Sequence, residues 1–235
     1  MNKKELKEIL NIYLREYLTK NGFKIDADIS LVKKTKLYTY KIFLLINTYE
    51  TVEVKSIFPT ISFSLIENPL HEIYCFDKLD SEKKFLLKNS KTIKRELLSI
   101  QINLELHNDN HVIGLSEIIK EYMETTAIPF FEKYSDLQTI NQEILANDMP
   151  YKEGVGYTGT MADFFKIPII GGDTRCILRR MFIMKYCKDS RYEDFLKWYQ
   201  YHLDVYEVNT HEPLRLRLYK IFNDTKEYLS KLEIS

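Results

Sequence analysis

Two histidines and an aspartate lie close together in the segment His107-Asn108-Asp109-Asn110-His111, which contains the only His-x-x-x-His in the chain. Imidazole and carboxylate groups are ligands of zinc, and the usual pattern places two histidines four residues apart on one helical face. Here the segment follows a predicted strand, and no third strong ligand group lies nearby in the sequence. We therefore predict a polar hairpin turn and no metal or cofactor, with His107, Asp109 and His111 as the candidate ligands of the metal-binding alternative.

The sequence Glu53-Val54-Lys55 matches half of a metal-dependent nuclease site. In such a site a carboxylate holds Mg²⁺ and the lysine orients the attacking water. A second acidic residue must lie close in space, and Asp26 and Asp28 are the nearest upstream candidates. The alternative is that Glu53 and Lys55 alternate on the solvent-facing side of a strand, which is a common pattern.

A basic stretch with interleaved tyrosines could contact nucleic acid, because lysines bind phosphates and aromatic rings stack on bases. The residues are Lys33, Lys34, Lys36 and Lys41 with Tyr38 and Tyr40. The alternative is an edge strand that lysines protect from aggregation, with tyrosines in the core. Lys and Arg number 34, Asp and Glu also number 34, and the pI is about 7.0. This neutral balance makes nucleic acid an improbable partner.

Five of the seven glycines lie between Asn147 and Asp173. Their spacing matches neither the dinucleotide-binding glycine pattern nor the phosphate-binding loop. The composition predicts a mobile loop or a domain junction over residues 147–173. Since binding residues concentrate on loops, the aromatic side chains of this segment are the candidate binding residues. They are Tyr151, Tyr157, Phe164 and Phe165.

The rest of the sequence shows no recognisable catalytic nucleophile. Cys75, Cys176 and Cys187 are an odd number without Cys-x-x-Cys spacing, and their apolar neighbours disfavour a thiolate. The N-terminus is charged and lacks the apolar core of a signal peptide. The longest strongly apolar run, residues 42–46, is too short to cross a bilayer. We therefore expect reduced cysteines in a cytoplasmic protein without membrane contact.

Hydrophobic periodicity predicts an α+β fold: an N-terminal helix and an antiparallel β-meander, packed by a kinked helix pair and followed by C-terminal antiparallel helices. The first helix is expected over residues 2–20. Strands are expected at residues 38–47, 52–66 and 98–106, with a bulge or an edge position at Pro59 and short strands at 29–32 and 71–76.

The helix pair spans residues 116–145. Ser116 is the expected N-cap of its first helix, and Pro129 is expected to kink or end that helix. The pattern from Ser135 to Gln138 is typical of a capping box, so a second helix should run from Asp136 to about Ala146.

The C-terminal helices have their own start signals. Asp173 can cap a helix over residues 174–187, Ser190 opens a second capping box, and Pro213 suits the first turn of the last helix. The expected organisation is an α+β domain at 1–146, the glycine-rich junction at 147–173 and a helical unit at 174–235, which can also pack on the first domain.

Two short motifs resemble a known family. The helix ending at Leu18 to Lys24 (LTKNGFK) and the sequence IPFFEKYSDL at Ile128 to Leu137 are similar to those of a bacterial family of uncharacterised proteins, described only as a domain of unknown function. The resemblance covers most of the chain. It implies a fold but no catalytic residue.

Together these features favour a non-enzymatic module that binds another protein, for example an immunity or toxin-neutralising protein. The sequence lacks a catalytic constellation and is rich in tyrosine, a residue enriched at interfaces. The alternatives are a metal-dependent hydrolase or nuclease that uses Glu53 and Lys55, and a nucleic-acid-binding module. The sequence leaves the oligomeric state open.

Overall fold

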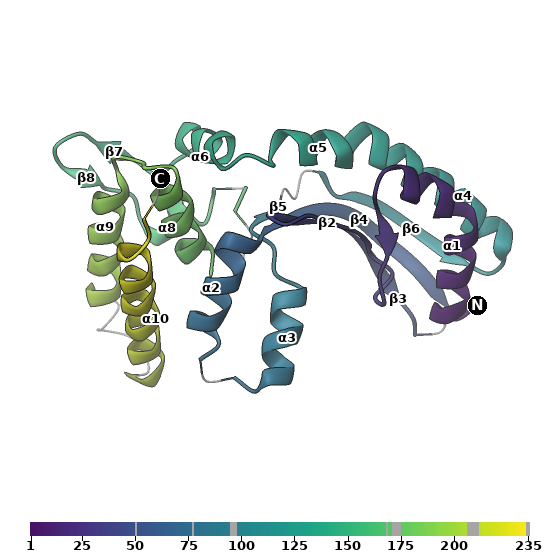
Figure 1. Cartoon of the computed structure of the whole chain (residues 1–235), viewed down its shortest axis with the longest axis horizontal. Helices are drawn as coiled ribbons and strands as arrows, with labels where there is room; N and C mark the ends of the chain where they lie inside the picture. The colour runs from purple at the N-terminus through teal and green to yellow at the C-terminus, as the bar shows by residue number, and fades with distance from the viewer. Residues whose placement is uncertain are drawn as a thin grey trace. The chain divides into compact units, whose positions relative to one another are not determined.

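The computed structural model describes residues 1–49, 51–76, 78–94, 98–167, 169–170, 175–205 and 212–233 (Figure 1). It confirms the α+β class. The chain divides into two compact units that alternate along the sequence: unit 1 is Met1–Ser64 with Ile93–Ser135, and unit 2 is Leu65–Thr92 with Asp136–Ser235. These boundaries differ from the contiguous domains expected from the sequence, which stay a prediction.

Unit 1 contains an antiparallel sheet, as predicted. The described strands pair in the order β1-β2-β3-β4-β5, and β6 pairs with β4 beside β5. The strands are β1 (Lys24–Ile25), β2 (Leu31–Lys34), β3 (Tyr38–Asn47), β4 (Val52–Phe63), β5 (Ile93–Lys94) and β6 (Ile100–Leu106).

The position of Pro59 corrects a prediction. β4 is a central strand, and its register with β3 shifts between Leu45 and Ile46 rather than at the proline. Along its other side β4 pairs with β6 as far as Ile57 and with β5 from Thr60. Pro59 falls in the gap between these two partners, where a missing N–H removes no ladder hydrogen bond on that side.

Helices cover one face of this sheet. In α1 (Lys3–Lys20) the side chains of Leu6, Leu10, Leu14 and Leu18 are buried, as their helical spacing predicts. α1 packs against α4 (Asp109–Tyr122). Figure 1 shows α4 and the following α5 (Ile128–Lys133) over the convex side of the curved sheet.

The predicted start of α4 was wrong. The helix begins within the segment expected to be a polar turn, and Asn108 is the N-cap, with Oδ1 accepting from the His111 N–H at 3.2 Å. Ser116 lies inside the helix, where its buried hydroxyl donates to the Val112 carbonyl. This internal bond satisfies the hydroxyl without a cap.

Pro129 does not end the helix. A π-helical turn at Met123–Ala127 connects α4 to α5, and the Ile128 N–H donates to the Met123 carbonyl five residues earlier. The wider turn makes room for the proline ring, which otherwise clashes with a carbonyl of the preceding turn. The aromatic residues that follow, Phe130, Phe131 and Tyr134, are buried as expected.

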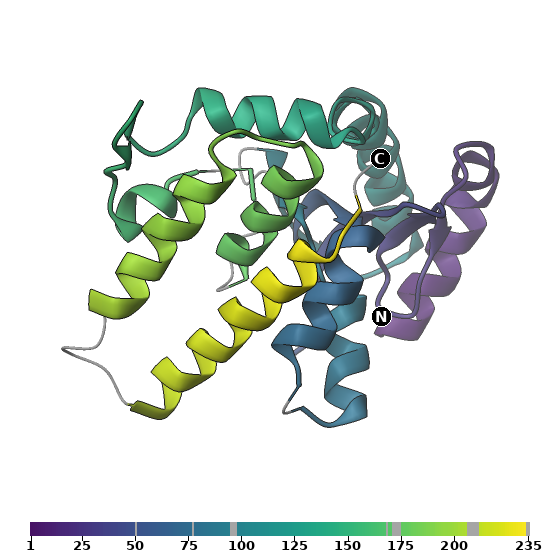
Figure 2. The same cartoon turned by 60° about the vertical axis from the view of Figure 1, so that its left-hand side comes forward.

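Unit 2 is mainly helical. Its elements are α2 (Ser64–Tyr74, beginning on the last residue of unit 1), α3 (Asp80–Lys88), α6 (Leu137–Ala146), β7 (Tyr151–Lys152), β8 (Gly156–Tyr157), α7 (Met161–Phe164), α8 (Cys176–Tyr186), α9 (Tyr192–Val205) and α10 (Glu212–Ser230). Figure 2 shows α9 and α10 side by side, and both pack against α8. Among the described helices, none is long and apolar enough to span a membrane.

Several predicted boundaries in unit 2 can be checked. The predicted strand at 71–76 is wrong, because Ile66, Glu67, Leu70 and His71 form the buried stripe of helix α2. α6 ends at Ala146 as predicted, but its cap is Asp136 rather than Ser135. Pro213 lies in the first turn of α10, as predicted. Asp173 lies outside the described residues.

Candidate binding surface and the charge network that supports it

α8 is the central helix of unit 2, and two adjacent arginines on it have no exposure to solvent. Every residue from Cys176 to Met184 is buried, including Arg179 and Arg180. Consecutive helical side chains point about 100° apart, so these arginines reach different carboxylates. Arg179 donates from Nε and Nη2 to the two oxygens of Glu67 at 2.7 and 3.0 Å, and Thr92 Oγ1 donates to Glu67 Oε1.

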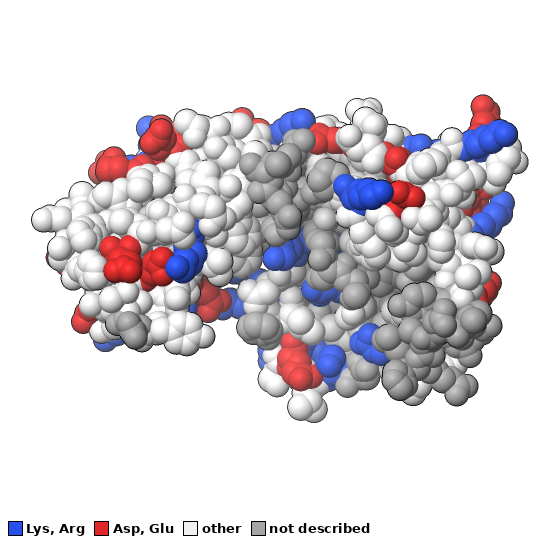
Figure 3. Space-filling view, turned by 180° about the vertical axis from the view of Figure 1, so that it is seen from behind, with Lys and Arg blue, Asp and Glu red and all other residues white. Residues whose placement is uncertain are grey.

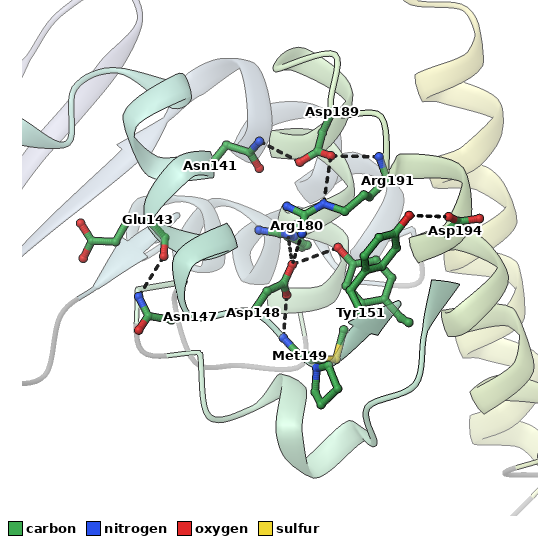
Figure 4. Close-up of polar contacts among 12 residues, drawn as sticks. Asn141, Glu143, Asn147, Asp148, Met149, Tyr151, Arg180, Asp189, Arg191 and Asp194 are labelled. Atoms are coloured by element: carbon green, nitrogen blue, oxygen red, sulfur yellow. Dashed lines mark hydrogen bonds and ion pairs between the residues drawn. The ribbon is translucent and has the colours of Figure 1, made fainter. Parts of the chain in front are cut away.

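Arg180 belongs to a second group of charges, shown in Figure 4. Its Nη2 donates to Asp148 Oδ2 at 2.8 Å, and the Tyr157 hydroxyl donates to the same oxygen at 2.9 Å. Arg191 Nη1 lies 3.7 Å from Asp148 Oδ2, and Arg191 Nε lies 3.5 Å from Asp189 Oδ1. Asn141 Nδ2 completes the group by donating to Asp189 Oδ2 at 2.9 Å. We call these residues the Asp148 network; they are Asn141, Asp148, Tyr157, Arg180, Asp189 and Arg191.

The network contains two guanidinium groups and two carboxylates, so its charges balance. Burial alone raises the pKa of Asp189, but hydrogen bonds from Asn141 and from the Arg191 N–H hold this pKa below its ordinary value. Burial also raises the pKa of the Tyr157 hydroxyl, so that it stays protonated and can donate to Asp148. The arrangement suits structural ion pairs rather than proton transfer near neutral pH.

This network anchors a β-hairpin that the sequence did not predict. Within the expected loop, β7 and β8 pair with Tyr151 opposite Tyr157. Gly154 and Gly156 form the turn with φ of +76° and +96°, values that only glycine adopts readily. The Asp194 side chain lies 3.6 Å from the position that a Cβ at Gly156 would occupy. That distance is an ordinary van der Waals contact, so the hairpin needs its glycines for their backbone conformation.

α9 holds the hairpin from the other side. Trp198 Nε1 donates to the Gly159 carbonyl at 2.7 Å, and the Tyr151 hydroxyl donates to Asp194 Oδ2 at 3.0 Å. Tyr157 also contacts the rings of Phe195 and Trp198. These contacts fix the hairpin against a helix.

The four predicted binding residues have different environments. Tyr157 and Phe164 are buried and pack with Phe195 and Trp198, so they belong to the core of unit 2. Tyr151 is half-buried, with its hydroxyl bonded to Asp194. Phe165 is 56% exposed. The sequence pattern singled out this segment as a whole and could not separate its core residues from its surface residues.

The most exposed apolar side chains here include two that the sequence did not single out. Val155 at the hairpin turn is 64% exposed and Tyr201 on α9 is 61% exposed. Both line a pocket of about 200 Å³ between the hairpin and α9. Its other lining residues are Gly156, Tyr157, Asp194, Lys197 and Trp198. We call Val155, Tyr201 and this pocket the hairpin–α9 surface. Tyr201 lies off the buried stripe of α9. That position in the helical pattern was the one sequence signal that could have indicated its exposure.

The histidine motif lies in unit 1, at the junction of β6 and α4. His107 Nε2 lies 3.1 Å from Glu105 Oε2, and His111 Nδ1 lies 3.1 Å from the Glu105 carbonyl oxygen. Asp109 begins the helix. No cluster of three potential metal-ligating side chains occurs in the described part of the chain.

The candidate nuclease residues are adjacent, but Asp26, one of their two expected acidic partners, is distant. Lys55 Nζ contacts Glu53 Oε1 at 2.5 Å. Asp26 Oδ2 instead lies 3.5 Å from Lys41 Nζ. Lys41 is opposite Thr60 in the sheet. At about 3.3 Å per residue, Thr60 and Glu53 are about 23 Å apart along β4. The structure therefore does not bring Asp26 to Glu53.

The residue opposite Glu53 is Glu105 on β6. The pairing of β4 with β6 thus places the Glu-x-Lys and His-x-x-x-His motifs side by side, which the sequence did not suggest. Like charges directly opposite each other are destabilising. Each glutamate has its own partner, Lys55 or His107.

The basic stretch does not form a single surface. Strand alternation places Lys33 and Lys41 on opposite faces of the sheet, because Val32 is the partner of Lys41. Lys41 is buried and forms an ion pair with Asp26. Its Nζ lies 4.2 Å from the Phe43 ring centroid. Figure 3 shows acidic and basic side chains of described residues scattered over the face in view. Neither observation favours a phosphate-binding surface.

Comparison of the chain with protein-family models, curated proteins and solved structures found no match. The family resemblance of the two short motifs therefore stays a prediction, and the function has to be argued from the geometry.

Proposed function

We propose that this protein binds another protein through the hairpin–α9 surface. The observation that carries the proposal is the exposure of Val155 and Tyr201 at one pocket, on elements held in place by buried contacts. Tyrosine is enriched at protein interfaces, where its ring supplies a large contact area and its hydroxyl keeps a polar partner. A pocket beside such side chains can accept an apolar side chain of the partner.

The supporting contacts favour binding by a preformed surface. The Trp198–Gly159 hydrogen bond and the Asp148 network fix the hairpin before any partner arrives. Binding then orders few additional groups, which lowers its entropic cost. A toxin-neutralising or immunity role is the concrete form that the sequence suggested, and it rests on the sequence alone.

The two alternatives have less support. A metal-dependent hydrolase needs a set of metal ligands around Glu53; Glu105 lies opposite it, but the described residues form no cluster of three metal-ligating side chains, and Asp26 pairs with Lys41. A nucleic-acid-binding module needs its lysines on one accessible surface, and Lys41 is buried. Each stays a prediction from the sequence.

A site-specific cross-linking experiment tests the proposal. The chain carries a photoreactive phenylalanine analogue in place of Tyr201 and, as a matched control, in place of Tyr13, an exposed tyrosine of α1 in unit 1. After irradiation in the source cells, we expect one protein to be cross-linked through position 201 and not through position 13. Recovery of the same proteins from both positions, or of none from position 201, would contradict the proposal.

Once the partner is identified, Tyr201→Ala should weaken binding of the partner by roughly 2 kcal/mol, or about thirtyfold in Kd. Truncation of a central interface tyrosine has an effect of this size. Tyr13→Ala is the matched variant and should leave Kd unchanged. Equal affinities of the two variants in isothermal titration calorimetry would place the interface elsewhere.

A further inference from the structure

A second pocket lies in unit 1, where the end of α1 and the turn after it meet β2, β3 and α5. Its volume is about 310 Å³, which is at the lower end of small-molecule sites. Its lining includes three aromatic residues and three charged residues. They are Phe23, Tyr40 and Phe131 with Lys20, Lys33 and Glu132.

The aromatic residues form a row of rings. Phe131 stacks on Phe23 with ring centroids 6.0 Å apart and on Tyr40 with centroids 4.6 Å apart. All three rings are mostly buried, so neighbouring side chains hold them in place. The Ile128 side chain adds an aliphatic contact to the lining. A flat apolar group in the pocket would therefore meet a fixed apolar wall.

Lys33 is held at this pocket by the backbone beside it. A Cβ at Gly22 would lie 3.3 Å from Lys33 Cε, so the lysine stem passes directly over the glycine. The ammonium lies 5.7 Å from the Phe23 ring centroid. The Lys33 side chain is half-buried, and its ammonium makes no ion pair or hydrogen bond with any described residue. The ammonium is therefore available to an external anion at the pocket, where a charge-assisted hydrogen bond can form.

The remaining charges set the net charge of the ligand. Among the residues that the structure describes, neither Lys20 nor Glu132 has a side-chain ion pair. Two ammonium groups and one carboxylate give the pocket a net charge of one positive unit. That charge complements a monoanion better than a phosphate that carries two negative charges.

We propose that this pocket binds a small aromatic monoanion, with the ring against Phe23, Phe131 and Ile128 and the carboxylate at Lys33 and Lys20. The pocket belongs to unit 1 and the hairpin–α9 surface to unit 2. Each proposal can therefore be tested without the other. In the sequence, Lys33 and Tyr40 belonged to the stretch that the nucleic-acid-binding alternative used. The structure places them at a pocket of small-molecule size.

The experiment uses two isosteric probes, phenylacetate and the neutral phenylacetamide, titrated into the full chain. The readout is the methyl resonance of Ile128 in a protein with labelled isoleucine methyl groups, with the exposed Ile12 methyl as the reference. We expect a saturable shift at Ile128 with phenylacetate and none with phenylacetamide. Equal binding of both probes, or no saturable shift with phenylacetate, would overturn the proposal.

Two neighbouring lysines provide the matched variants. Lys33→Gln removes the charge at the pocket, whereas Lys34→Gln removes the charge of the next residue, which is exposed and points to the other face of the sheet. Loss of a charge-assisted hydrogen bond should raise the phenylacetate Kd about tenfold in Lys33→Gln. Lys34→Gln should leave it unchanged. If circular dichroism shows that Lys33→Gln is unfolded, Lys20→Gln replaces it. Equal Kd values in the pocket and control variants would refute the site.

Discussion

Asp148 Oδ2 lies 2.8 Å from Arg180 Nη2, and the exposed fractions of the two side chains are 5% and 0%. Nε and Nη1 of Arg180 have no hydrogen-bond partner among the described residues. The carboxylate of Asp148 is therefore the main compensation for a charge that is fully removed from water. The same carboxylate binds the hydroxyl of Tyr157 in the hairpin. This ion pair thus connects the core of unit 2 to the surface proposed to bind a partner.

Removing the charge of Asp148 should destabilise the protein strongly. Asp148→Asn keeps the side-chain shape but leaves the Arg180 charge buried without compensation, and breaking a buried ion pair in this way costs about 3–5 kcal/mol. Urea unfolding measures the loss. The matched variant Glu153→Gln changes an exposed carboxylate of the same hairpin and should lie within about 0.5 kcal/mol of the native protein. Similar losses in the two variants would mean that Asp148 does not compensate Arg180.

Two glycines should respond to alanine with opposite signs. Gly22 ends α1 with φ of +75°, and a Cβ there meets Lys33, so Gly22→Ala should lower the free energy of unfolding by about 1 kcal/mol or more. Gly114 is exposed within α4, and no atom lies within 4 Å of an added Cβ. Gly114→Ala should raise stability by up to about 1 kcal/mol. Thermal unfolding of the two variants checks the difference, and a shift in the same direction would contradict it.

His71 should make stability depend on pH below neutrality. The side chain is 4% exposed, Nε2 has no hydrogen-bond partner among the described residues, and Nδ1 lies 3.7 Å from Cys75 Sγ. Burial lowers the pKa of His71 below its ordinary 6.5, with Glu72 opposing the shift and Arg175 adding to it. The unfolded chain therefore binds a proton at a higher pH than the folded chain does. Stability is fully present above pH 6.5 and falls as the pH drops toward the folded pKa.

Urea unfolding at pH 7.5 and 5.5 measures this dependence. His71→Gln should reduce the loss of stability between the two pH values, even if it lowers stability at both. His107→Gln changes an exposed histidine that contacts Glu105 and should not reduce the loss. An unchanged loss in His71→Gln would show that other groups cause it.

The cysteines should react slowly in the folded protein. Burial raises the pKa of Cys187 to about 11, with further contributions from Asp136 and Asp189, and its thiol donates to the Leu137 carbonyl. Cys75 and Cys176 are buried. Since the thiolate is the reactive form, iodoacetamide at pH 7.5 should modify all three only after urea unfolding. Ser190→Cys, at an exposed position, is the positive control. Rapid alkylation of Cys187 in the native protein would contradict the expectation.

Local patterns predicted much of the fold. The leucine stripe of α1, the two-residue alternation of β3 and the first-turn proline of α10 each arise from residues a few positions apart. Predictions failed where the structure of a neighbouring segment decides whether a residue begins or ends a helix. Ser116 has the side chain of an N-cap, yet the helix begins at Asp109, where Asn108 is the N-cap. Pro129 would break an ordinary α-helix, but a π-helical turn accommodates it.

The sequence by itself determined the α+β class, most elements and the segment that carries the candidate binding residues, because periodicity, caps and glycine content act over short distances. Only the tertiary structure decided which side chains meet. Arg179 and Glu67 are separated by 112 residues, and Arg180 and Asp148 by 32. Buried arginines cannot be recognised from sequence, because their burial depends on carboxylates that distant segments supply. Exposure of Tyr201 and burial of Tyr157 depend in the same way on how the hairpin packs against α9.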